Sequence, residues 1–122
     1  MGFRFEKLDI WNDAINYVNK IYSLTKNFPR DELFGLKDQL RRSASSISAN
    51  IAEGSGSSSK RDFSNYLNIS IKSIYETVSH LHIARSQNYI PENKRTELYN
   101  EAEVLVKRIQ SFRKWLNANH KP

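Results

Sequence analysis

The residues of this sequence whose types and spacing suggest chemistry are its lysines and arginines. Between Val104 and Pro122 the chain has several basic residues and no acid. On a helix, Lys107 and Lys114 would lie on the same side, because they are seven residues apart. A row of cations on one face is typical of proteins that neutralise the phosphates of a nucleic-acid backbone. The phosphate-binding residues predicted in this segment are Lys107, Arg108, Arg113 and Lys114.

We predict a second basic cluster around the second helix and the linker that follows it. Its members are Lys37, Arg41, Arg42, Lys60 and Arg61. Two simpler explanations stay open: basic residues can serve solubility alone, and cations near the carboxyl end of a helix are favoured by the helix dipole. No recognition-helix module, aromatic stacking platform or zinc motif is visible in the sequence. Any nucleic-acid binding is therefore expected to be salt-sensitive and weakly sequence-specific.

Patterns that indicate catalysis or metal binding are lacking in the sequence. Glu76 and His80 are one helical turn apart and could share an ion, but two ligands do not make a site. The sequence has no Glu-x-x-His pair of the kind that builds di-iron sites in helix bundles. It also has no cysteine, no G-x-S-x-G nucleophile turn and no glycine-rich phosphate loop. We therefore predict a protein that is not an enzyme and that uses no cofactor or metal.

Length and composition limit the architecture to one soluble domain. The chain has 122 residues, a formal charge of +6 and an isoelectric point near 9.7. Hydrophobic residues make up 39% of it, which is enough for a core. No stretch is apolar for long enough to span a membrane, and the amino-terminal residues lack the apolar segment of a signal peptide. We expect a cytoplasmic protein that does not bind membranes.

Apolar residues at spacings of three and four predict four amphipathic helices, at about residues 9–26, 36–53, 60–87 and 91–117. We expect Gly54 to end the second helix in a left-handed conformation, and Ser58 or Ser59 to cap the third. Short connections make neighbouring helices antiparallel. The predicted fold is therefore all-α: residues 1–122 form a single antiparallel, up-down-up-down four-helix bundle.

Two of these helices also have unusual outward faces, which indicates self-association. On the third helix, isoleucines lie opposite the core stripe. The outward side of the second helix, opposite its own core stripe, has mostly small residues, which would let another helix approach closely. A carboxylate buried there needs a cation, so we predict that Arg42 of one copy pairs with Glu76 of another. The alternative is that the two are solvated separately. The predicted homo-oligomer interface comprises Arg42, Ser46, Ala49, Glu53, Tyr66, Ile69, Glu76 and Ile83.

One part of the sequence is distinctive beyond its periodicity. It runs from Phe28-Pro29 through Glu32-Leu33-Phe34-Gly35-Leu36 and Gln39-Leu40-Arg41-Arg42 to Asn50-Ile51-Ala52-Glu53-Gly54. This pattern resembles the small bacterial four-helix-bundle family encoded by intervening sequences within 23S ribosomal RNA genes. The likeness extends over essentially the whole chain, and its polar pattern includes Arg41, Arg42, Asn50, Glu53 and Glu76. The chain departs from it mildly at Ser43, and at Ile71-Lys72-Ser73 where a Gly-Ser pair is common.

The resemblance implies a bundle that assembles as a barrel-shaped homopentamer. A related branch, the accessory variability determinant of diversity-generating retroelements, is a basic pentamer that binds nucleic acid and a reverse transcriptase. Two functions therefore follow as hypotheses. The first is a non-enzymatic homo-oligomer that binds the backbone of RNA or DNA. The second is a structural adaptor that docks a protein partner such as a reverse transcriptase, without binding nucleic acid itself.

Overall fold

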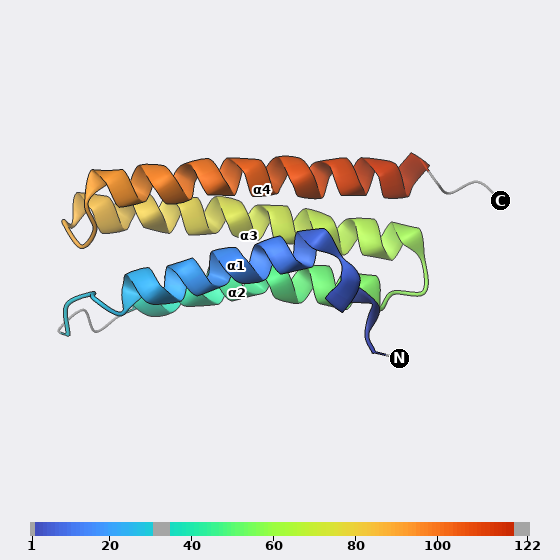
Figure 1. Ribbon diagram of the computed structural model, residues 1–122, viewed down its shortest axis with the longest axis horizontal. Coiled ribbons are helices and arrows are strands. Elements are labelled where there is room, and N and C mark those ends of the chain that lie inside the picture. Colours follow the sequence, from blue (N-terminus) through green and yellow to red (C-terminus); the bar gives the residue numbers. More distant parts are fainter. Residues whose placement is uncertain (1, 31–34, 119–122) are drawn as a thin grey trace.

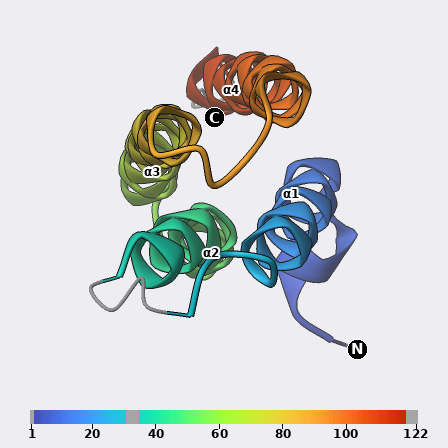
Figure 2. The ribbon, with the colours of Figure 1, turned by 90° about the vertical axis from the view of Figure 1, so that its left-hand side faces the viewer.

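The computed structural model describes residues 2–30 and 35–118, which contain four long helices and one short one. A 3₁₀ helix, η1 (Arg4–Lys7), precedes α1 (Asp9–Thr25), and α2 (Leu36–Ser55), α3 (Lys60–Ser86) and α4 (Glu92–Ala118) follow. The four α-helices run alternately in opposite directions and pack as a bundle (Figures 1 and 2). The predicted all-α four-helix bundle is confirmed, and each predicted helix matches the observed one to within two residues at either end.

The predicted apolar stripes form the core. Leu40, Ile47 and Ile51 of α2 are fully buried, as are Leu67 of α3 and Ile109 of α4. In the described part of the chain, no helix has the length and apolar character needed to cross a membrane.

The ends of α3 are set by local hydrogen bonds. The backbone N–H of Asp62 donates to the Ser59 Oγ at 3.1 Å, which identifies Ser59 as the cap residue. At the other end Asn88 has a φ of 62°, and the Tyr89 N–H donates to the Ala84 carbonyl. A left-handed residue here turns the chain sharply, so that α4 can begin four residues later and run back along α3.

Gly54 has a different role from the predicted one. It lies inside α2, which continues to Ser55, and its φ is not positive. A Cβ atom at this position would lie 2.7 Å from the Tyr66 Cβ and 2.8 Å from the Phe63 Cδ1. The glycine is needed because α2 and α3 approach closely here, and not because the helix must stop.

Hydroxyl groups fill the seam between α2 and α3. The Ser70 Oγ donates to the Ile47 carbonyl at 2.8 Å, and the Thr77 Oγ1 donates to the Ser43 Oγ at 2.8 Å. Nearer the surface, the Ser73 Oγ donates to the Ser46 Oγ at 3.0 Å. Small side chains whose polar atoms are paired let two helices pack tightly without a cost from unpaired groups. The seam between α1 and α4 is much looser.

Candidate nucleic-acid interface

Lys107 and Lys114 lie on the outward side of α4, as the sequence predicts. Both are exposed, whereas Leu105, Ile109 and Leu116 of the same helix face the core. Within residues 2–30 and 35–118 neither lysine has a hydrogen bond or an ion pair. Their ammonium groups are therefore available to a ligand.

The two arginines of the same segment are held by the protein. The Arg108 Nη1 lies 2.6 Å from the Asp13 Oδ2 of α1, so this guanidinium leans toward α1. The Arg113 Nε donates to the Ser64 Oγ of α3 at 2.8 Å. Arg108 and Arg113 thus lie on opposite flanks of α4, and only Arg113 lies beside α3.

The structure does not bring the second predicted basic cluster together. Lys37, Arg41 and Arg42 lie in the first two turns of α2, whereas Lys60 and Arg61 begin α3 beside the opposite end of α2 (Figure 1). α2 has 20 residues, so its ends are about 30 Å apart. The grouping was wrong because residues just after the start of a helix and residues just after its end are separated by the whole length of that helix.

Arg41 is tied to α1. Its Nε donates to the Thr25 Oγ1 at 2.8 Å, and its Nη2 donates to the Tyr22 carbonyl at 3.2 Å. The guanidinium also lies 4.5 Å from the centre of the Tyr22 ring. These contacts satisfy one carbonyl and one hydroxyl group near the carboxyl end of α1, so Arg41 has a structural role.

A different set of exposed cations lies along α3 and α4. Arg113 contacts Ser64, and the rings of His82 and Tyr99 lie 6.1 Å apart, so two pairs fix the antiparallel register of these helices. In that register Lys72 lies opposite Lys107. Sequence reasoning missed Lys72, because it stands alone in sequence and its neighbours come from another helix.

We call this set, which has five members, the basic strip. Its members are exposed, and none has a hydrogen bond or an ion pair with the described residues. In the same stretch of the two helices, residues 60–75 and 104–118, the only acid is Asp62. The basic strip consists of Lys60, Arg61 and Lys72 of α3, with Lys107 and Lys114 of α4.

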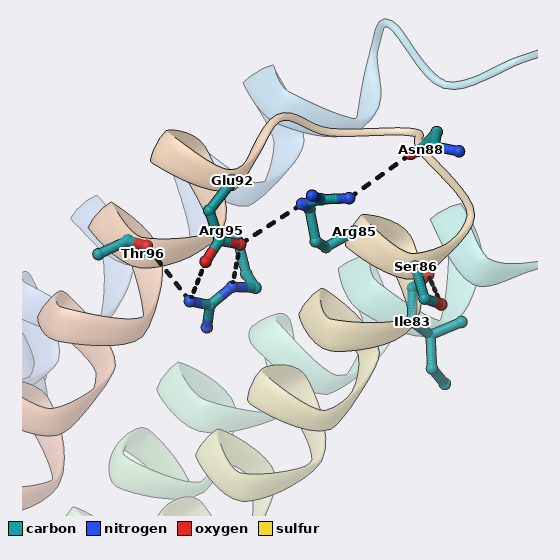
Figure 3. Close-up of polar contacts among 7 residues, drawn as sticks. All are labelled: Ile83, Arg85, Ser86, Asn88, Glu92, Arg95 and Thr96. Atoms are coloured by element: carbon teal, nitrogen blue, oxygen red, sulfur yellow. Dashed lines mark hydrogen bonds and ion pairs between the residues drawn. The ribbon is translucent and has the colours of Figure 1, made fainter.

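At the other end of α3 and α4 the charges neutralise one another. The Arg95 Nε and Nη2 donate to the two carboxylate oxygens of Glu92 at 2.7 and 2.8 Å, and the Arg85 Nε lies 3.4 Å from the same carboxylate (Figure 3). The hydrogen bond from Arg95 holds the pKa of Glu92 below its ordinary value. The Lys94 Nζ lies 3.4 Å from the Glu97 Oε2. The cations at this end form ion pairs within the protein.

The predicted oligomer interface forms one surface of the protomer, along the outer side of the α2–α3 seam. The Ser73–Ser46 hydrogen bond brings the two predicted stripes side by side. Ile69 and Ile83 are 45% and 44% exposed, and Arg42, Ala49, Glu53 and Glu76 are exposed too. Tyr66 and Ser46 are half-buried. The oligomeric state itself stays a prediction.

The Glu76–His80 pair is part of this surface. The His80 Nε2 lies 3.3 Å from the Glu76 Oε2, one turn away on α3. No third ligand joins them: in the described part of the chain, histidines and acids nowhere gather in a group of three that could hold a metal ion.

Two comparisons with known proteins give matches. A family described as "23S rRNA-intervening sequence protein" matches residues 6–111. Among solved structures, a protein of unknown function from the S23 ribosomal protein family of Bacteroides thetaiotaomicron superposes with a TM-score of 0.79. The two chains are 28% identical, and the match covers 86% of this chain and 98% of that one. A comparison with curated proteins gives no match.

Proposed function

This chain belongs to the 23S rRNA-intervening sequence protein family, and on that premise we propose that it is a non-enzymatic homo-oligomer that binds the backbone of RNA or DNA. The observation that carries the proposal is the basic strip. Its cations are exposed and lack partners in the described structure, so contact with phosphates would release counterions without first breaking ion pairs.

The helix dipole does not account for most of the basic strip. Lys60 and Arg61 begin α3, at the positive end of its dipole, where a cation is disfavoured. Lys107 is about three turns from the end of α4 at Ala118, beyond the range in which the dipole acts. A structural benefit to single helices therefore explains little of this charge, and a negatively charged ligand explains it better.

Self-association would multiply the contact. Several copies of the basic strip on one particle raise the effective concentration of each for the same nucleic acid. The exposed isoleucines beside the small residues of α2 support an interface on the α2–α3 surface. The family resemblance implies five copies.

The interface is tested by reversing one charge and then restoring complementarity. Glu76→Arg should dissociate the oligomer in size-exclusion chromatography with light scattering, because it places two cations together at the predicted Arg42–Glu76 contact. The double variant Arg42→Glu with Glu76→Arg should reassemble. If Glu76→Arg stays assembled, the pairing of Arg42 with Glu76 is wrong.

Nucleic-acid binding is tested by filter binding to a structured RNA across a salt series. The affinity should fall steeply as salt rises, and Lys107→Glu with Lys114→Glu should abolish binding at about 100 mM salt. An absence of binding by the unaltered protein at about 50 mM salt would remove this function and leave the adaptor that docks a protein partner.

A further inference from the structure

A groove opens between α3 and α4, directly beside the basic strip. It has a volume of about 330 Å³, at the lower end of the range of small-ligand pockets. Tyr75 of α3 lines one side and Tyr99 of α4 lines the other. The remaining apolar lining comes from side chains of both helices: Ile74, Val78, Ala102 and Val106.

Tyr75 is the unusual member of this groove. It is 67% exposed, more than any other tyrosine among the large exposed hydrophobic residues of the described chain. Tyr99 has ring contacts with His82 and with the Arg95 guanidinium. In contrast, no aromatic or cationic neighbour within residues 2–30 and 35–118 contacts the Tyr75 ring. Two thirds of this residue is exposed, so a face of its ring is open to stack on a ligand.

The charge along the groove changes from positive at one end to negative at the other. Lys107 and Gln110 line one part of it, Lys72 lies opposite Lys107, and Lys114 lies beyond them in the basic strip. Glu103 also lines the groove, one turn from Lys107 toward the ion-paired end. A phosphate would be repelled by Glu103 and attracted toward the lysines. A nucleobase is neutral, and its amino groups can donate to a carboxylate such as that of Glu103.

We propose that this groove holds an unpaired nucleobase stacked on Tyr75, while the flanking phosphates lie on Lys107 and its neighbours in the basic strip. This proposal rests on the proposed function and names its ligand class, single-stranded RNA or DNA. Aromatic rings beside a cationic track are the usual platform for single strands, because every base offers a flat apolar face. The bases of a duplex are stacked on one another and cannot enter such a groove.

The test compares strands that carry the same phosphates with and without bases. Fluorescence anisotropy measures the binding of a 12-nucleotide oligocytidine strand and of an abasic strand of the same length, at one fixed salt concentration. The unaltered protein should bind the base-bearing strand about tenfold more tightly. Tyr75→Ala should abolish this preference, and Tyr75→Phe should keep it because the ring remains. A control, Tyr22→Ala, removes an exposed tyrosine of α1 and should leave the preference unchanged.

The outcomes separate this proposal from the proposed function. If Tyr75→Ala keeps the preference, or if the unaltered protein binds both strands equally, the stacking groove is wrong. In either case loss of binding in Lys107→Glu with Lys114→Glu would still support the phosphate-binding function. If the unaltered protein binds neither strand at about 50 mM salt, the stacking groove is wrong, and filter binding to the structured RNA then decides the phosphate-binding function separately. Because Tyr75 is exposed, circular dichroism of Tyr75→Ala should match that of the unaltered protein and exclude unfolding as the cause.

Discussion

The two flanks of α4 use charge in opposite ways. On the α1 side, Arg108 pairs with Asp13 and Lys20 pairs with Glu101. On the α3 side, Lys107 and Lys114 face solvent together with Lys72, without partners in the described structure. The two sides of α4 thus differ: on one side cations form ion pairs within the bundle, and on the other side they have no partner in the described structure. A basic residue is informative about function only after its partners are known.

The α1 side combines its ion pairs with looser helix packing. The buried Tyr17 hydroxyl donates to the Leu98 carbonyl at 3.0 Å, and burial raises the pKa of this hydroxyl well above its ordinary value. The hydrogen bond to Glu101 raises the pKa of Lys20. Polar contacts therefore join α1 and α4 where apolar contacts are few, whereas the α3 side combines apolar packing with free charge.

Among single substitutions, the largest effect on this contrast is expected from Lys72→Glu. Reversing a charge in the basic strip should weaken RNA binding about tenfold and lower the salt dependence by about one phosphate contact. The free energy of unfolding should not change, because Lys72 is exposed and has no partner in the described structure. Filter binding and urea unfolding on the same preparation check both parts. A fully retained affinity would remove Lys72 from the site.

A smaller effect, on stability alone, is expected from Tyr17→Phe. This variant leaves the Leu98 carbonyl without its side-chain donor in a buried place, so the free energy of unfolding should fall by about 1 kcal/mol. Tyr75→Phe is the matched change on the other flank and should cost almost nothing. Urea unfolding of the two variants compares the flanks. Equal losses would mean that the α1 side does not depend on its polar contacts.

Releasing the paired cations tests whether location matters more than net charge. Asp13→Asn with Glu101→Gln frees Arg108 and Lys20 and raises the formal charge by two. Because these cations lie on the α1 side, RNA affinity should rise at most about threefold. Anisotropy at a fixed salt concentration measures this. A tenfold gain would show that overall charge, and not the basic strip, governs binding.

The smallest effect concerns the ion-paired end of α3 and α4. The pKa of Glu92 is lowered in the folded protein, so its pairing with Arg95 stabilises the fold above the ordinary carboxyl pKa of 4.5. This stabilisation is lost as the pH falls through the lowered value. Arg95→Gln should therefore be slightly less stable than the unaltered protein at pH 7, and the difference should shrink steadily as the pH falls below 4.5 toward about 3. A difference that is the same at pH 7 and at about pH 3 would mean that Arg95 stabilises the fold by packing.

Helix bounds were readable from the sequence because they depend on local patterns. The apolar stripe around Leu40 and Ile47, and the capping serine before Lys60, need only neighbours a few residues away. The role of Gly54 was predicted wrongly because a glycine is required there by the close approach of Phe63 and Tyr66 of α3, which no local pattern indicates. The site was predictable only in part for the same cause. The shared outward side of Lys107 and Lys114 was predicted because they lie on one helix, whereas Lys72 and Tyr75 join this candidate site only through the register of α3 against α4.

The most direct test of the central claim compares two double variants with identical net charge. Lys107→Gln with Lys114→Gln removes two free cations of the basic strip, whereas Lys20→Gln with Lys94→Gln removes two cations that pair with Glu101 and Glu97. At about 100 mM salt the first should weaken RNA binding at least tenfold, and the second should change it less than threefold. Equal losses in the two variants would contradict the account, because binding would then depend on total charge alone.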